Sequence, residues 1–238
     1  MQIEQTTINL LLNHPLFGVF ITLAAFKLGQ FIYQRSGKQP TLQPMIVGLA
    51  TVFGALYWLD LSFEQYFSTA QPLHLMLGPV TVALAVPLYE NITKIRALLA
   101  PIIITVIVGS FITVSITIAI GYLLGASETS LLSLMTKSIT TPIAMAISKE
   151  IGGIPALSAV FVIYTGIIGV IFGPFILDKM NITDKSLRGI TLGISAHAIG
   201  TARALEEDSE IGAFSALAMG LTGFLTAFAL PVILLYVA

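Results

Sequence analysis

The stretch that decides the fold is GISAHAIGTARALEEDSE, residues 193–210, where polar and ionisable side chains interrupt a strongly apolar sequence. Its central part carries Ser195, His197, Thr201 and Arg203, and an acidic cluster follows at once. Polar and ionisable groups are costly at membrane depth, so they usually line a site or a pathway. The stretch therefore predicts a functional site, provided that the rest of the chain lies in a membrane.

The composition of the chain indicates that it lies in a membrane. Of the 238 residues 56% are hydrophobic and only 10% are charged, and the mean hydropathy is +0.94. A soluble domain has about 25% charged residues, so we expect an all-α integral membrane protein. The formal net charge is −1, without a basic tract for nucleic acid, and there is no cysteine for a disulfide or a thiolate metal site. No cofactor is expected.

Eight apolar stretches approach the length of about 20 residues that a membrane-crossing helix needs. Short loops join them, so we expect residues 1–238 to form a single polytopic membrane domain. The stretches are 9–33, 42–59, 72–90, 96–124, 131–149, 155–177, 187–205 and 211–237.

Lysine and arginine in the short loops predict the orientation, because such loops tend to be cytoplasmic. Arg35 and Lys38 follow the first stretch, and Lys94 and Arg96 follow the third. Both loops should therefore be cytoplasmic, which places the N-terminus outside. If all eight stretches crossed, the later basic residues would fall outside and the acidic cluster inside, against this rule.

One element that does not cross would restore agreement with the charge rule. The candidate is 131–149, in which Thr141 and Pro142 form a helix-start signal in the middle of the apolar run. We therefore predict about seven transmembrane helices plus one re-entrant or broken helix. In this topology 187–205 runs outward and the acidic cluster lies outside. The alternative is a full span kinked at Pro142.

An internal repeat is suggested by an offset of 60 residues. Seven positions are identical between 141–157 and 201–217, whereas 81–97 shares only Thr81 and Glu90 with both. We expect an inverted repeat with halves 1–125 and 126–238. Interrupted helices in corresponding positions of a repeat are typical of secondary transporters. The alternative is a general resemblance among apolar helical hairpins.

The positions of His197 and Arg203 predict a break in their helix. On a continuous helix His197, Gly200 and Thr201 share a face, while Arg203 points about 120° away. Either Arg203 reaches the acidic end, or the helix breaks near Gly200. A break would free backbone N–H groups for a carboxylate, which an arginine can grip with two bonds. The alternative is a packed small-residue face with Arg203 paired to Glu206 or Glu207.

Three ordered stretches, 77–92, 137–157 and 193–221, resemble the hallmark segments of the LrgB/CidB family, and the resemblance extends over essentially the whole chain. It implies a bacterial inner-membrane protein that acts with a small LrgA/CidA-type membrane protein. The family is described as antiholin-like, modulating murein hydrolase activity and autolysis. Its plant relatives are plastid glycolate/glycerate translocators, and bacterial members have been linked to pyruvate movement.

Between these two functions, broken helices and an ordered polar site favour transport of small monocarboxylates such as glycolate, glycerate or pyruvate. The alternative is a holin- or antiholin-like modulator of murein hydrolase activity. An enzyme is not expected, because no Ser–His–carboxylate set stands out. Membrane lipid is an expected partner, and homo-oligomer formation stays open. The predicted substrate-binding residues are Ser195, His197, Gly200, Thr201, Arg203, Thr140, Thr141, Lys137 and Thr81.

Overall fold

A computed structural model describes residue 12 and residues 14–237 of the chain, and its regular elements are all helices. The predicted all-α class is therefore confirmed for these residues. The chain forms two compact units, Met1–Ala83 and Leu84–Ala238. Part of the first predicted stretch, residues 9–11 and 13, lies outside the described residues. The single domain with repeat halves 1–125 and 126–238 stays a prediction.

The first unit is built on the close packing of α2 against α3 and α4. Glycine allows the approach: a Cβ at Gly29 would lie 2.5 Å from the carbonyl oxygen of Pro44. The N–H of Gly18 donates to the Thr69 hydroxyl at 3.0 Å. The described helices of this unit are α2 (Phe17–Arg35), η1 (Pro40–Leu42), α3 (Pro44–Trp58), α4 (Phe63–Leu75) and α5 (Leu77–Ala83).

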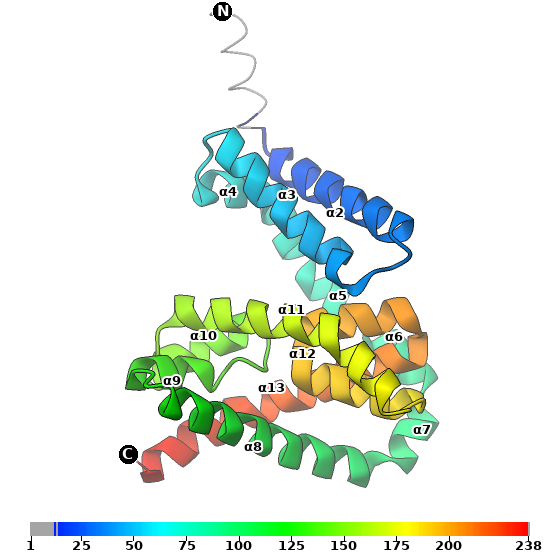
Figure 1. Ribbon diagram of the computed structural model, residues 1–238, viewed down its shortest axis with the longest axis vertical. Helices are drawn as coiled ribbons and strands as arrows, with labels where there is room; N and C mark the ends of the chain where they lie inside the picture. Colours follow the sequence, from blue (N-terminus) through cyan, green and yellow to red (C-terminus); the bar gives the residue numbers. More distant parts are fainter. Residues whose placement is uncertain (1–11, 13, 238) are drawn as a thin grey trace, which may run out of the picture. The chain divides into compact units, whose positions relative to one another are not determined.

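The described part of the second unit contains four helices of 23 residues or more, together with four shorter ones (Figure 1). Its largest buried apolar cluster joins α8, α12 and α13 through Ile102, Val106, Ile190 and Phe214. The elements are α6 (Ala85–Glu90), α7 (Ile92–Ala97), α8 (Leu99–Leu123), α9 (Glu128–Leu134), α10 (Thr141–Glu150), α11 (Pro155–Lys179), α12 (Lys185–Glu207) and α13 (Ser209–Val237).

Five helical runs among the described residues are long and apolar enough to cross a membrane. They are Phe17–Arg35, Phe63–Glu90, Leu99–Leu123, Pro155–Lys179 and Ser209–Ile233, and Pro44–Trp58 is a shorter apolar helix. The predicted number of about seven is not confirmed. Neither 131–149 nor 187–205 forms a single straight span, because each stretch is interrupted by non-helical backbone.

The stretch 131–149 is broken, as predicted. Six residues, Met135 to Thr140, separate α9 from α10 as turns, and Thr140 is the extended N-cap residue of α10. The two parts fold back on each other, because the Ser133 hydroxyl accepts from the N–H of Ile154 at 2.8 Å. The hydroxyl of Ser158 donates to the Ser133 carbonyl at 3.1 Å. The α9–α10 pair is therefore a hairpin, and a full span kinked at Pro142 is wrong.

The helix α12 also doubles back, which the sequence did not predict. His197 has φ 42° and ψ −128°, outside the helical region. The Lys185 ammonium lies 2.6 Å from the Asp208 carboxylate, whereas a straight helix would separate these residues by about 35 Å. The two arms, 185–196 and 198–207, cross so closely that a Cβ at Gly200 would lie 2.7 Å from that of Ala196.

This geometry corrects the predicted topology. The acidic cluster after α12 lies beside Lys185 and Arg188, so 187–205 does not run outward and the two charged groups are not on opposite sides. The predicted break is present, three residues before Gly200. Gly200 is where the returning arm packs against the first arm, because it lacks a Cβ.

The two hairpins open at opposite ends of α11, whose 25 residues extend over roughly 37 Å. The base of α9–α10 is bonded to Ile154 and Ser158 at the start of α11. At the other end, Arg188 in the base of α12 lies 2.6 Å from Asp178. In Figure 1 the green α9–α10 hairpin and the yellow connection between α11 and α12 accordingly lie at opposite ends of this unit.

Candidate functional site

The tips of the two hairpins meet beside α11. His197, at the turn of α12, donates from Nε2 to the carbonyl oxygen of Val162 at 2.9 Å. Ile139, in the tip of the α9–α10 hairpin, belongs to the same buried cluster as Val162. Two segments that start from opposite ends of the unit thus come together around one turn of α11.

His197 is held in a strained conformation and has one free ring nitrogen. A non-glycine residue in such a backbone conformation costs about 1–3 kcal/mol. The side chain is only 2% exposed, and a Cβ at Gly166 would lie 2.9 Å from its Cε1. Because Nε2 donates to Val162, Nδ1 is the acceptor of the neutral ring, and it is buried without a partner. Packing therefore fixes the ring and leaves one nitrogen for a ligand.

Lys137 brings a positive charge to the same tips. Its ammonium donates to the Ser138 hydroxyl at 3.2 Å, and within the described residues it forms no ion pair. It lies two residues before Ile139, which packs in the same buried cluster as Val162, the residue that His197 contacts. The acidic residues nearest in sequence, Glu128 and Glu150, lie at the start of α9 and the end of α10. A part-buried cation without a carboxylate partner favours an anionic ligand.

The start of α10 adds to this positive potential. Thr140 is its N-cap residue, and the Thr140 side chain makes no capping bond. The first-turn N–H groups of a helix lack partners inside the helix, and they attract anions. The second arm of α12, beginning after His197, also starts at the tips. Thr140, Thr141, Lys137 and His197 are thus brought together as predicted residues of one small polar region.

Two other predicted residues, Thr201 and Gly200, stabilise the turn of α12, and Ser195 lies in its first arm. The Thr201 hydroxyl donates to the His197 carbonyl at 2.9 Å and is bonded to the Ser215 hydroxyl at 3.0 Å. Gly200 allows the arms to cross. Ser195 donates to the carbonyl oxygen of Thr191 at 2.6 Å. The hydroxyl groups of Thr201 and Ser195 therefore already have protein partners.

Two predicted residues lie elsewhere. Arg203 is at the base of α12, where its guanidinium Nη1 lies 3.6 Å from the Glu206 carboxylate. It also lines a polar cavity of about 470 Å³ there. The alternative pairing of Arg203 with Glu206 is therefore confirmed, although the helix is broken. Thr81 belongs to the first unit, where its hydroxyl donates to the carbonyl oxygen of Leu77 at 2.7 Å.

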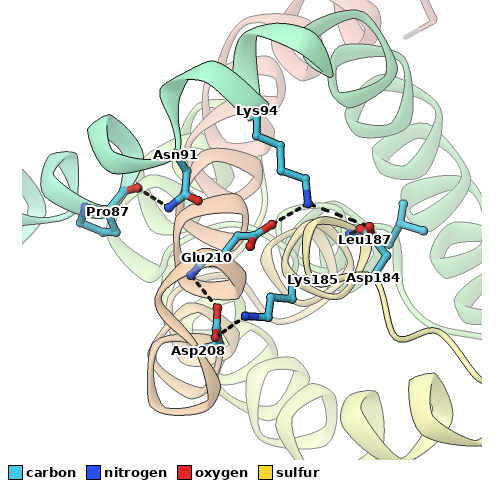
Figure 2. Close-up of polar contacts among 8 residues, drawn as sticks. All are labelled: Pro87, Asn91, Lys94, Asp184, Lys185, Leu187, Asp208 and Glu210. Carbon is cyan, nitrogen blue, oxygen red and sulfur yellow. Dashed lines mark hydrogen bonds and ion pairs between the residues drawn. The ribbon is translucent and has the colours of Figure 1, made fainter.

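An ion-pair network at the base of α12 was missed by the sequence analysis. Figure 2 shows Lys94 between the carboxylates of Glu210, at 2.6 Å, and Asp184, at 4.0 Å. The same view shows the ion pair between Lys185 and Asp208. The bond from Lys185 lowers the pKa of the Asp208 carboxyl, and the bond to Glu210 raises the pKa of Lys94. These charged residues are evident in the sequence. A straight α12, however, would have placed Lys185 and Asp208 on opposite sides of the membrane.

We call this base the charged end of the second unit. It comprises Lys94, Asp178, Asp184, Lys185, Arg188, Glu207, Asp208 and Glu210.

Comparison with known proteins agrees with the resemblance seen in the sequence. A Bacillus subtilis (strain 168) protein named YwbG is 37% identical over 91% of this chain and 96% of its own length. A holin-like protein CidB of Staphylococcus epidermidis is 30% identical over 91% of this chain and 94% of its own. An antiholin-like protein LrgB of Bacillus cereus is 26% identical over 94% and 97%, respectively.

No solved structure matches the chain. The model of the LrgB-like family matches residues 22–236. The chain therefore belongs to the LrgB-like family.

Proposed function

We propose that the protein transports small monocarboxylates, of the glycolate, glycerate and pyruvate class, through the region where the two hairpin tips meet. The observation that carries the proposal is Lys137, a part-buried cation with no ion-pair partner in the described part of the chain. A bound carboxylate would neutralise it, and the start of α10 beside it would supply N–H groups.

In this proposal Lys137, and not Arg203, provides the fixed positive charge for the substrate. Thr140 and Thr141 hold the carboxylate at the start of α10, and Nδ1 of His197 accepts a hydrogen bond from the hydroxyl group of glycolate or glycerate at the other tip. Gly200 and Thr201 hold the turn that presents His197, and Ser195 lies two residues before His197 in the first arm. Arg203 serves the charged end, since it lies beside Glu206.

The arrangement also supports an inverted repeat within the second unit. A hairpin followed by a long helix occurs twice, as α9–α10 with α11 and as α12 with α13. The offset of 60 residues pairs Lys137 with His197 and Thr141 with Thr201, so equivalent positions fall at the two tips. Broken helices that meet at mid-membrane from opposite sides are the usual setting of a secondary-transporter site.

Sidedness follows from the charge rule. The charged end carries Lys94, Lys185 and Arg188, whereas the base of α9–α10 has only Lys149 near it. We infer that the charged end is cytoplasmic in the bacterial inner membrane. With α2, α3, the run 63–90, α8, α11 and α13 crossing, the N-terminus lies outside.

Uptake by proteoliposomes that contain the purified protein tests the proposal. We expect accumulation of labelled glycolate or pyruvate, and we expect Lys137→Met to abolish it, because the substituted chain has no cation at the tips. Lys149→Met is the matched control, since Lys149 is exposed at the end of α10 and its loss should leave uptake intact. Uptake that survives Lys137→Met would refute the site.

A holin- or antiholin-like role, in association with an LrgA/CidA-type partner, is the second candidate, and it is favoured by the names of two relatives, holin-like protein CidB and antiholin-like protein LrgB. This role predicts leakage of unrelated small solutes from the same proteoliposomes, with or without the partner. The leakage should be indifferent to Lys137→Met, because a lesion needs no single anion site.

A further inference from the structure

We propose that the α9–α10 hairpin is the moving gate of the site and that the α12 hairpin is part of its fixed wall. The proposal rests on the proposed transport function, and it assigns different roles to two hairpins of similar outline. Two differences between the hairpins carry it, the ion pairs at their bases and the glycines that flank them, together with the close backbone contacts of α12.

Packing holds α12 firmly on two sides. On one side, the backbone of its first arm lies directly against α13, because a Cβ at Gly189 or Gly193 would clash with the carbonyl oxygens of Ile211 and Ser215. On the other side, a Cβ at Gly169 of α11 would lie 2.6 Å from that of Ala196. Backbones in such close contact cannot separate without opening voids, which close-packed interiors resist.

Ion pairs also fasten α12 at its base. Lys185 links the first arm to Asp208 at 2.6 Å. Arg188 bridges Glu207 of the second arm, at 2.8 Å, and Asp178 of α11, at 2.6 Å. The guanidinium lies in a part-buried position with a side chain only 10% exposed. Moving α12 away from α11 or opening its arms would therefore break charge-assisted bonds, which are about twice as strong as neutral ones.

The α9–α10 hairpin is held at its base by weaker polar interactions than α12. Its base is held by neutral bonds, from the N–H of Ile154 to the Ser133 hydroxyl and from the Ser158 hydroxyl to the Ser133 carbonyl. Within the described residues no ion pair joins the segment 128–150 to the rest of the unit. Its tip carries turns in place of a regular helix. The hairpin packs on α11 and α13 through buried apolar side chains, but a movement of it breaks no charge-assisted bond, so it costs less than a movement of α12.

Left-handed glycines flank the hairpin on both sides. Gly125, before α9, has φ 74°, and Gly152, after α10, has φ 86°. Gly125 has open space around its Cβ position, and Gly152 meets only the side chain of Leu132, at 3.8 Å. Glycine can change its backbone angles across both signs of φ without a steric penalty, so these positions can absorb a rotation of the hairpin. The residues that flank α12, Asp184 with φ −63° and Asp208 with φ −165°, are not glycines.

If the hairpin swings about these glycines, Lys137, Thr140 and Thr141 move with it, while His197 stays in place. The site then opens toward the α9–α10 end and away from the charged end. A bound hydroxy acid such as glycolate would hold the gate closed, because its carboxylate pairs with the moving Lys137 while its hydroxyl group donates to Nδ1 of the fixed His197.

Hydrogen–deuterium exchange on the purified full chain tests the mobility without reference to transport. We expect backbone amides in α10 to exchange at least ten times faster than those in the arms of α12. Equal rates, or faster exchange in α12, would overturn the gate assignment whatever the protein transports.

Chemical cross-linking then tests the function of the movement, and the natural chain has no cysteine to interfere. The Cδ1 of Ile143 in α10 lies 3.3 Å from a Cβ built at Gly223 of α13, and the Cδ1 of Ile194 in α12 lies 3.6 Å from one built at Gly109 of α8. The pairs Ile143→Cys with Gly223→Cys and Gly109→Cys with Ile194→Cys are therefore matched. A short bifunctional reagent that forms a disulfide with each cysteine ties each hairpin to a neighbouring long helix.

We expect the cross-link at 143 and 223 to block uptake until a reductant or thiol releases it, and the cross-link at 109 and 194 to leave uptake unchanged. Continued uptake with the first link, or loss of uptake with the second, would overturn the assignment. If the uncross-linked protein shows no uptake, the proposed function fails by itself, and the exchange experiment still decides whether α9–α10 is the mobile hairpin.

Discussion

Replacing Arg188 by methionine should loosen the base of the α12 hairpin. The Arg188 guanidinium donates to Glu207 through Nε at 3.0 Å, to Asp178 at 2.6 Å and to the carbonyl oxygen of Ile182 at 3.1 Å. Methionine keeps most of the apolar stem but has no donor. The substitution therefore leaves Glu207 part-buried without its partner.

The exposures of the partners set the magnitude. Removing one partner from a fully buried ion pair costs about 3–5 kcal/mol, whereas exposed pairs contribute about 0–1 kcal/mol. The Glu207 side chain is 25% exposed and that of Asp178 is 67% exposed, so most of the loss comes from Glu207. We expect about 2 kcal/mol, which for a protein of this size lowers the melting temperature by about 4–8 °C.

Thermal unfolding of the purified protein in detergent measures this effect. The control is Lys185→Met, which removes a neighbouring pair whose side chains are 49% and 31% exposed and should lower the melting temperature by less. If the two variants lose the same stability, or if Arg188→Met loses none, the ion pairs do not hold the hairpin in the way inferred here.

Two further predictions concern the charged end. The bond from Lys185 holds the pKa of Asp208 below its ordinary value of 3.8, so its contribution to stability is present above that value and lost as the pH falls through the lowered pKa. The melting temperatures of wild type and Asp208→Asn should therefore differ at neutral pH and converge in strong acid; a difference independent of pH would count against the pair. For topology, Ser209→Cys should react with a membrane-impermeant thiol reagent from the cytoplasmic side and Ser127→Cys from the outside. The reverse result for Ser209 would restore the outward run of 187–205.

The membrane class, the long spans and the break in 131–149 could be predicted because they depend on local properties. A run of about 20 apolar residues shows directly where a helix can cross the lipid bilayer. A Thr–Pro pair is a helix-start signal wherever it occurs, and the structure begins α10 at Thr141, one residue before the predicted Pro142. The residues gathered at that start were accordingly identified.

The fold of α12 could not be predicted from local signals. The sequence 185–207 lacks proline, and the break predicted near Gly200 gave no indication that the chain would reverse its direction there. What turns the chain at His197 is tertiary: the bond to Val162, the space at Gly166 and the crossing at Gly200. Once α12 is a hairpin, Arg203 moves from the site to the charged end, so one missed turn changed both the topology and the site.

The distance across α12 provides the most direct test, because both the opposed hairpins and the site at their tips depend on it. Spin labels on Thr183→Cys and Ser209→Cys, both exposed beside the ends of α12, report this distance in the otherwise cysteine-free chain. We predict a separation below about 20 Å, whereas a straight helix over these positions would give roughly 39 Å. A long distance of that kind would contradict the doubling back of α12, and with it the meeting of the two tips.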